Sequence, residues 1–214
     1  MTNITLEQVS PDFLEKEKIA HSEIWNKRVS IQKGERLQIV APSGSGKSSL
    51  IHFLYGMRKD YHGNILFDGK PVKNFTAEDT AANRSDHISI IFQDLRLFPE
   101  QTANENIEIK RLLQPYHPQS KVIEMAEALG VSSKLKQLGK TCSYGEQQRI
   151  AIIRSLQQPF DFLLLDEPFS HLDENNRHKA MKLIEDEAGK RGAAIILADL
   201  KPIEYFNSER TLHL

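Results

Sequence analysis

One short segment constrains the fold more than any other part of this chain. Arg36–Val40 is a short run of β-forming residues, and Ser48–Tyr55 carries apolar residues at helical spacing. Between them lies the glycine- and serine-rich sequence Ala41–Lys47. A strand that passes through such a loop directly into a helix is typical of an α/β fold with a mostly parallel, covered sheet.

The same loop predicts a site for phosphate groups. Gly44 and Gly46 allow the backbone to curl so that successive N–H groups point inward, and the helix that follows adds its positive N-terminal end. Lys47 would reach the β- and γ-phosphates of a nucleoside triphosphate such as ATP, and the Ser48 hydroxyl is a ligand for Mg²⁺. We expect the nucleotide to contact Ser43, Gly44, Ser45, Gly46, Lys47, Ser48 and Ser49.

Two details of this loop bear on that prediction. The usual pattern begins with glycine, and Ala41 holds that place here, which is acceptable where the backbone φ is negative. An ordinary surface loop would explain the glycines and serines. It would not explain Lys47-Ser48 at the junction of strand, loop and helix, so nucleotide binding is the favoured interpretation.

A pair of acids follows a second predicted strand, Phe162–Leu165. Side chains at the carboxyl edge of a parallel sheet project into the crevice where ligands bind. There Asp166 would hold Mg²⁺ and Glu167 would polarise an attacking water. Taken alone, an acid pair before a proline turn is better explained as an ordinary strand end. Because the same chain carries the phosphate loop, the catalytic interpretation is favoured.

The rest of the chain predicts one domain of 214 residues. Its nucleotide-binding core would comprise 1–93 and 150–214, with an antiparallel β part near the N-terminus, and 94–149 would form an inserted helical subdomain. Glu15–Lys18 is expected to be a solvated turn. Gly130 is expected to cap a helix. Strands are predicted at 4–9, 29–31, 63–69, 88–92, 193–197 and 210–214. Helices are predicted at 121–129 and 177–190.

Composition limits the classes of partner. Lys and Arg number 28 and Asp and Glu 29, giving a net charge of −1, which argues against a protein that binds nucleic acid by bulk electrostatics. The single cysteine, Cys142, excludes a disulfide within the chain and fits a reducing compartment. No apolar run approaches the roughly 18–20 residues that span a bilayer, so we expect a soluble chain whose membrane role comes through a partner.

A second serine-glycine turn, Cys142–Arg149, opens another predicted helix. A serine hydroxyl and a glycine amide at a helix start would form a further phosphate clamp, although a simple helix N-cap accounts for the isolated string equally well. Together with the phosphate loop and the acid pair, the turn resembles the Leu-Ser-Gly-Gly-Gln signature of the ATP-binding subunits of ABC transporters. Cys142 replaces the leucine and Tyr144 the first glycine, while Ser143 and Gly145 are kept.

The resemblance covers the whole chain and implies roles for further residues. Gln93 resembles the glutamine that touches Mg²⁺ and the water, and Asp94–Pro99 the face that receives a transmembrane subunit. Ser170–Asp173 is similar to the loop that crosses to the opposite subunit. Phe13 resembles the aromatic residue that stacks on adenine, although a core phenylalanine fits as well. The implied catalytic residues are Glu167, Gln93 and Lys47. The implied metal ligands are Ser48, Gln93 and Asp166. The implied nucleotide contacts across the dimer are Ser143, Gly145, Glu146 and Asp173.

In that family two copies meet head to tail, and each ATP lies between the phosphate loop of one chain and the signature of the other. The resemblance implies an ATPase in a homodimer or heterodimer, in the cytoplasm and attached to the inner face of the membrane through a permease subunit. The alternative is a soluble member that acts as a nucleotide-switched interaction protein. A small-molecule kinase is disfavoured because it has no use for the turn at Cys142–Arg149.

One departure from the family pattern concerns hydrolysis. The family places a histidine that contacts the γ-phosphate after the strand at 195–197, and this chain has Asp199 there. A carboxylate facing a phosphate repels it unless it is protonated, bridged by metal or turned away. Because the loss of one transition-state donor commonly costs about 10²-fold in turnover, we expect slowed hydrolysis. The alternative is that Asp199 points elsewhere and another group serves.

Overall fold

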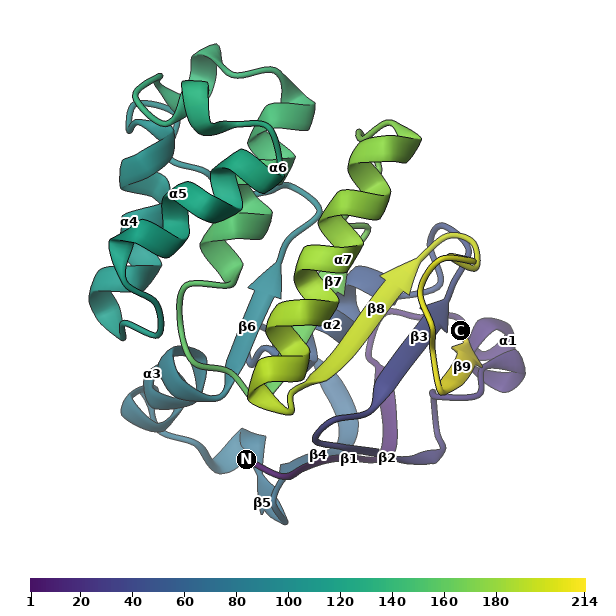
Figure 1. The fold of residues 1–214 in the computed structure, drawn as a ribbon. Coiled ribbons are helices and arrows are strands. Elements are labelled where there is room, and N and C mark those ends of the chain that lie inside the picture. The colour runs from purple at the N-terminus through teal and green to yellow at the C-terminus, as the bar shows by residue number, and fades with distance from the viewer.

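Two β-sheets of different character form the centre of the structure, a computed structural model that describes residues 1–214 (Figure 1). In the larger sheet every pair of neighbouring strands is parallel, as the sequence predicted. Its strands, in spatial order, are β6 (Ile88–Ile91), β7 (Phe162–Asp166), β8 (Ala194–Asp199), β3 (Arg36–Val40) and β9 (Arg210–His213).

The parallel sheet is covered on both faces, and β7, which lies between β6 and β8, shows why. Leu163 and Leu165 of β7 belong to one buried apolar cluster, whereas Phe162 and Leu164 belong to another. Successive side chains of a strand point to opposite faces, so an unbroken apolar run requires apolar cover on each side. Helix α7 (Glu174–Arg191) contributes to the first cluster and α2 (Lys47–Leu54) to the second.

The smaller sheet is antiparallel and lies at the N-terminal end of the chain. Its order is β2 (Arg28–Gln32), β1 (Asn3–Pro11), β4 (Tyr61–Phe67) and β5 (Lys70–Pro71). Asp68 and Gly69, both with positive φ, form the turn between β4 and β5. This sheet shares its apolar cluster with α2 and one face of the parallel sheet, and it confirms the expected antiparallel β part.

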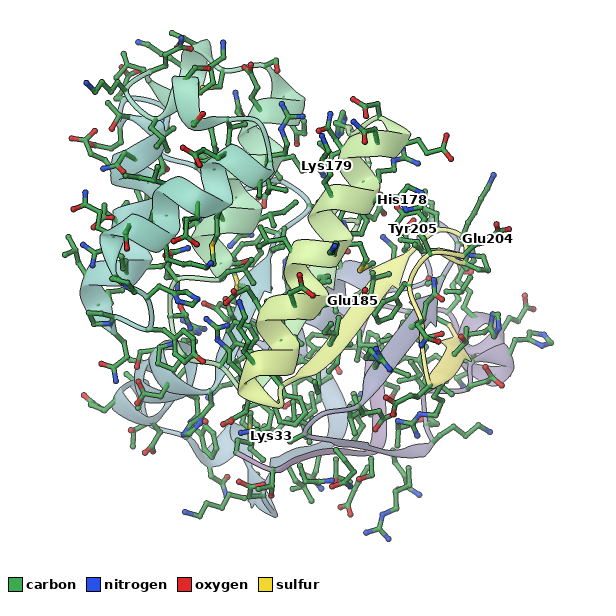
Figure 2. The ribbon with its side chains drawn as sticks, in the orientation of Figure 1. Lys33, His178, Lys179, Glu185, Glu204 and Tyr205 are labelled. Atoms are coloured by element: carbon green, nitrogen blue, oxygen red, sulfur yellow. The ribbon has the colours of Figure 1, made fainter.

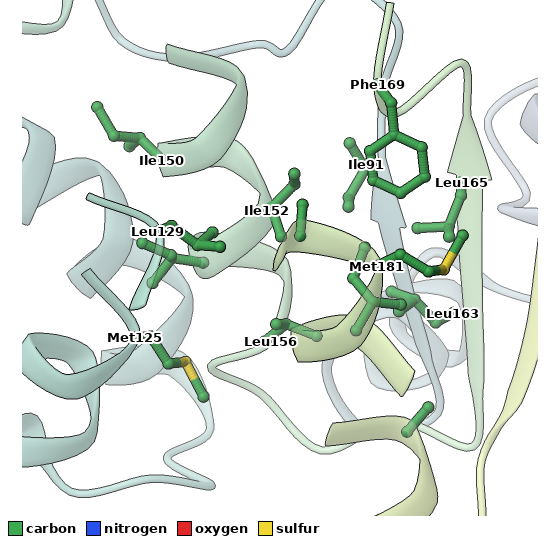
Figure 3. Close-up of a cluster of buried hydrophobic side chains, with 14 of the residues drawn as sticks. Ile91, Met125, Leu129, Ile150, Ile152, Leu156, Leu163, Leu165, Phe169 and Met181 are labelled. Atoms are coloured by element: carbon green, nitrogen blue, oxygen red, sulfur yellow. The ribbon is translucent and has the colours of Figure 1, made fainter. Parts of the chain in front are cut away.

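A group of helices is inserted between β6 and β7 and forms the teal and green lobe of Figure 1. It contains α4 (Ala103–Leu113), α5 (Gln119–Ala128) and α6 (Tyr144–Ser155), with short 3-10 turns at Ser132–Lys134 and Gly139–Thr141. Figure 3 shows α6 side chains facing β7 and α7, so one apolar cluster joins the insert to the core. The predicted boundary between residues 149 and 150 falls inside α6, so the insert and the core share this helix.

Several local expectations can be compared with the structure. Gly130, with φ of 66°, follows α5 as expected of a helix cap. Glu15–Lys18 is exposed to solvent as expected, but the expected turn is wrong, because the helix α1 (Lys16–His21) begins there. Helix α3 (Ala77–Asp86) was missed, as was the short 3-10 turn at Val72–Asn74. None of the helices is both long and apolar enough to cross a membrane.

Candidate functional site

The phosphate loop follows β3 and ends where α2 begins at Lys47. Gly46 has a φ of 92°, and a Cβ there would lie 3.1 Å from Cζ2 of Trp25. The indole N–H of Trp25 donates to the carbonyl oxygen of Ser45 at 3.1 Å and so supports the loop from beneath. Gly44 also has positive φ, at 76°. Glycine at 44 and 46 is therefore required by backbone conformation, and at 46 by space as well.

The alanine at the start of the loop is accommodated in the way the sequence required. Ala41 is fully buried and is not among the residues with positive φ. Its N–H donates to the carbonyl oxygen of Asp199 at 3.0 Å, which ties the loop to the end of β8. No extra space or special conformation is needed at this position, so the replacement of glycine leaves the loop intact.

A cavity of about 290 Å³ opens over the loop and gathers most of the expected nucleotide-binding residues. Ser45 lies outside its lining, because its side chain donates to the Pro42 carbonyl within the loop. The lining residues are Phe13, Pro42, Ser43, Gly44, Gly46, Lys47, Ser48, Ser49, Gln93 and Glu167.

Lys47 and the acid pair form the charged centre of this cavity. The Lys47 ammonium group bonds the Glu167 carboxylate and lies 3.5 Å from Oδ1 of Asp166. All three side chains are buried. Glu167 has a φ of 46°, a conformation that is strained for a residue with a side chain. Its N–H is held by the carbonyl oxygen of Ala198 at 2.9 Å, so the neighbouring strand enforces this backbone.

Asp166 has the properties of a ligand for a hard cation. Burial raises the pKa of its carboxyl group, while a hydrogen bond with Ser48 and the charge of Lys47 oppose that shift. Its Oδ1 is buried and has no hydrogen-bond partner. Oxygen donors from a carboxylate and a hydroxyl beside a phosphate site are the set that Mg²⁺ prefers. The residues present therefore fit Mg²⁺, with Asp166 and Ser48 among the protein groups that would hold it.

Gln93 reaches the site from a strained loop after β6. Its exposed side chain lines the cavity over the loop, and also a neighbouring one of about 440 Å³ that Asp166 and Tyr144 share. Leu95 and Arg96 both have positive φ, at 57° and 49°. Arg154 of α6 donates to the carbonyl oxygens of both residues, and burial lowers its pKa to about 10. The partly buried guanidinium of Arg154 thus fixes the segment that follows Gln93.

The face expected to receive a membrane subunit is smaller than the sequence suggested. The expected apolar patch of this face, Asp94–Pro99, consists of Leu95, Leu97 and Phe98.

 In the structure Leu95 is only 2% exposed and has a left-handed backbone, and Leu97 is partly buried against the apolar cluster that joins the insert to the core. Phe98 alone is well exposed, at 53%. The expected apolar patch is therefore wrong for Leu95 and holds for Phe98.

The turn at Cys142–Arg149 forms the start of α6, on the surface of the helical insert. Ser143 is the N-cap: its hydroxyl accepts from the N–H of Glu146 at 3.4 Å, and its own N–H donates to Oε2 of Glu146 at 2.8 Å. A Cβ on Gly145 would lie 3.0 Å from the carbonyl oxygen of His171, so only glycine allows this close approach. Ser143 is exposed to solvent.

Asp173 repeats this arrangement at the start of α7. Its carboxylate accepts from the N–H of Asn176 at 2.9 Å, and the side chain is exposed. Neither helix start contributes to the cavity over the phosphate loop. Within one chain the structure therefore does not bring the following candidates to the phosphate loop: Ser143, Gly145, Glu146 and Asp173.

Comparison with known proteins decides which family uses this arrangement. A family model described as ABC transporter matches residues 25–170. This chain belongs to the ABC transporter family. The ABC transporter ATP-binding protein YtrE of Bacillus subtilis (strain 168) is 33% identical over 172 residues, which cover 79% of this chain and 74% of YtrE.

Solved structures of ABC cassettes share the fold. The dimeric structure of MJ0796, a bacterial ABC transporter cassette, matches with a TM-score of 0.85 at 25% identity, over 99% of this chain and 94% of that one. A dimeric post-hydrolysis state of MJ0796 bound to ADP and Pi matches with a TM-score of 0.84 at 25% identity, with the same coverage of both chains. The chain is thus an ABC-type ATPase domain with the fold of a P-loop NTPase.

Asp199, at the end of β8, lies beside Asp166 and Glu167 and outside the cavity over the loop. Its Oδ1 accepts from the N–H of Leu200 at 2.7 Å. Burial raises the pKa of its carboxyl group, and the negative charge of Glu167 adds to that shift. The residue lines a separate groove of about 520 Å³, whose wall includes Tyr205. Figure 2 shows Tyr205 beside His178 of α7, and their ring centroids are 4.4 Å apart.

Phe13 follows β1 and is not a core residue, because its side chain is 53% exposed and lines the cavity over the phosphate loop. The core alternative considered for this residue is therefore wrong. Two neighbours of the site were missed by sequence reasoning. Arg58 lies over the Phe13 ring, and Tyr144 donates to the carbonyl oxygen of Gln93 at 3.4 Å. Both contacts join distant segments, so no local pattern signals them.

Proposed function

We propose that this ABC ATPase closes around two Mg·ATP as a dimer and uses the cycle of binding and hydrolysis to drive a separate membrane subunit. The second chain is another copy or a similar ATPase. One observation carries the proposal: the phosphate-loop half of the site is complete within one chain, and the serine and glycine of the signature turn are displayed elsewhere on its surface.

This division explains why a pair of chains is needed. Each half offers groups that suit phosphates, namely the glycine loop with Lys47 on one side and the exposed start of α6 on the other. A head-to-tail pair would bring the two halves together twice, once around each nucleotide. The dimeric cassettes of MJ0796, which share the fold, support this arrangement.

The charged centre suggests how the residues divide the chemistry. Lys47 would exchange its bond with Glu167 for the β- and γ-phosphates, which leaves the Glu167 carboxylate free to polarise a water. Gln93 lines the same cavity and would orient that water. Bound Mg²⁺ would supply positive charge against the phosphate oxygens, held by Asp166, Ser48 and Gln93.

Slow hydrolysis is part of this proposal. No histidine stands at the end of β8, and the Asp199 carboxylate is committed to the backbone N–H of Leu200. A negatively charged carboxylate that accepts a hydrogen bond is a poor substitute for a hydrogen-bond donor to the γ-phosphate. We therefore infer that nucleotide-driven closure is retained while turnover is low.

The membrane partner would dock near Phe98, which is exposed on the loop between β6 and α4. The chain would then reside in the cytoplasm against the inner face of the membrane. In this scheme residues 94–149 move as a helical unit relative to the core formed by 1–93 and 150–214. Arg154 and the strained loop after Gln93 connect the two parts, so a movement at Phe98 would reach the catalytic centre.

Co-purification from detergent-solubilised membranes tests the choice between a transport subunit and a soluble switch. The tagged wild-type chain should retain an integral membrane protein, and Phe98→Glu should lose it while keeping ATP binding. Ile123→Glu, which alters another exposed apolar residue of the helical insert, is the matched control and should keep the partner. Recovery of soluble partners alone would favour the nucleotide-switched interaction protein.

A further inference from the structure

Arg58 contacts two residues that line the cavity over the phosphate loop. Its guanidinium carbon is 4.9 Å from the centroid of the Phe13 ring, and its Nη1 donates to Oγ of Ser49 at 3.0 Å. Phe13 and Ser49 both line the cavity, whereas Arg58 does not. Arg58 is thus placed behind the wall of the site, in contact with two of its lining residues.

An ion pair and a backbone hydrogen bond fix this arrangement. Arg58 Nε donates to Oδ1 of Asp60 at 2.9 Å, and Nη2 bonds the other carboxylate oxygen. The carbonyl oxygen of Asp60 accepts from the N–H of Asp12 at 3.2 Å. The segment that carries Phe13 is therefore joined to the segment that carries Arg58 by both side-chain and main-chain contacts.

We propose that Arg58 is a positioning residue for the base of the nucleotide. It covers one face of the Phe13 ring and holds the ring at the edge of the cavity, where the other face can receive a flat heteroaromatic base. It acts through Phe13 and makes no contact with the phosphates. This inference rests on the proposed function, because it requires that a nucleotide occupy the cavity.

Without Arg58 the Phe13 ring would be poorly fixed. More than half of the Phe13 side chain is exposed, so few packing contacts restrict its rotamer. A guanidinium stacked on an aromatic ring is held by the ring's electrostatic field and by flat contact, which lysine does not reproduce. A ring that is ordered before the ligand arrives saves the entropy of ordering it on binding.

The test compares a ligand that carries a base with one that does not. Isothermal titration of the full chain with Mg·ADP and with Mg·tripolyphosphate measures both affinities. Arg58→Met, which keeps the aliphatic length, should weaken ADP binding about threefold to tenfold. The affinity for tripolyphosphate should stay within about twofold, because that ligand has nothing to place on Phe13.

Three companion variants separate positioning from general damage. Arg58→Lys should lose less ADP affinity than Arg58→Met. In a Phe13→Leu background, Arg58→Met should cause no further loss, since its effect passes through the ring. Arg84→Met is the matched control: Arg84 lies over Tyr55 at the same 4.9 Å, and neither residue lines the cavity. It should leave both affinities unchanged.

The outcomes distinguish failure of the inference about Arg58 from failure of the proposed function. The inference is overturned if Arg58→Met weakens both ligands equally, leaves both unchanged, or adds its full effect to that of Phe13→Leu. Should Arg58→Met fail to fold by circular dichroism, Arg58→Lys and its Phe13→Leu combination provide the same comparison. Failure of the wild-type chain to bind Mg·ADP would instead contradict the proposed function.

Discussion

The two halves of the candidate site differ in shape, in burial and in how their side chains are bonded. The phosphate-loop half is concave, and the side chains of Lys47, Asp166 and Glu167 are buried and bound to one another. The signature half is on the surface, where Ser143 and Asp173 are exposed and each caps a helix. The first half is recognisable as a binding site in a single chain, and the second is not.

This difference explains why a site shared between two chains would not be recognisable in one of them. Helix capping explains Ser143 and Asp173 completely within the chain, because each satisfies a backbone N–H of the first turn. Any role toward a nucleotide on another chain is additional to that local one. Experiments that separate the two halves must therefore distinguish loss of a cap from loss of a clamp.

The largest effect is expected from Lys47→Ala in the phosphate-loop half. Without the ammonium group, Asp166 and Glu167 lose their only cationic partner in the cavity, and the phosphates lose their main counter-charge. ATP turnover should fall by about 10³-fold. Lys33→Ala is the control, since Lys33 pairs with Asp161 at the opposite end of the molecule (Figure 2), and it should leave turnover unchanged.

The signature half is tested by paired substitutions of Ser143. Ser143→Ala should cost about 1 kcal/mol of stability through the lost cap, whereas Ser143→Asp keeps a capping oxygen and should cost little. Both should lower ATP turnover, and Ser143→Asp by about 10²-fold, because its charge would face the phosphates of the partner's nucleotide. Nucleotide binding to the monomer should stay the same. Thermal melting, titration and turnover measure the three quantities.

Thr102 provides a matched cap outside the site. It forms the same capping box at the start of α4, with Glu105 in place of Glu146. Thr102→Ala should therefore cost a similar amount of stability, and Thr102→Asp little, with no effect of either on turnover. If the Thr102 variants lowered turnover as the Ser143 variants do, the distinction between cap and clamp would be lost.

Asp199→His restores the residue that the family places at the end of β8. A ring N–H in that position could donate to the γ-phosphate, so steady-state ATP turnover should rise by about tenfold or more. Asp199→Asn measures how much of any gain comes only from removing the charge. Equal turnover of the wild-type and Asp199→His proteins would show that Asp199 does not limit hydrolysis.

The smallest effect is a pH dependence of stability. Burial raises the pKa of Asp199 in the folded chain above its ordinary value of 3.8, so the ionised form is disfavoured there. The stability that wild-type Asp199 contributes is then fully present below about that value and is lost as the pH rises through the folded pKa. Asp199→Asn should therefore melt higher relative to wild type at pH 7 than at pH 4. The same substitution at the exposed Asp186 of α7 is the control.

Local patterns predicted the parts of the molecule that depend on local physics. The strand, loop and helix around Ala41–Ser48 follow from glycine conformation and apolar spacing, and the strand ending at Asp166 follows from an apolar run. Helix α3 lacks an apolar stripe and buries no residue, so periodicity could not reveal it. Its capping box at Thr76 and Asp79 was the only available signal.

Features that depend on chain reversal or distant contacts were not predictable in this way. The burial of Leu95 depends on a left-handed backbone that no sequence rule assigns to leucine. The place of Phe13 beside the phosphate loop depends on how β1 lies against the core, and its contact with Arg58 joins the segment after β1 to the segment after α2. The sequence shows that residue 13 is aromatic, but it does not determine whether the Phe13 side chain lies in the core or lines a cavity.

Dimer formation by Glu167→Gln tests the central claim most directly. This substitution should remove hydrolysis while keeping the phosphate loop and the signature turn intact. Sedimentation of the purified variant saturated with Mg·ATP should show a dimer, and addition of Ser143→Asp should return it to a monomer. A Glu167→Gln protein that stays monomeric at saturation, with no second ATPase chain co-purifying, would contradict a nucleotide held between two chains.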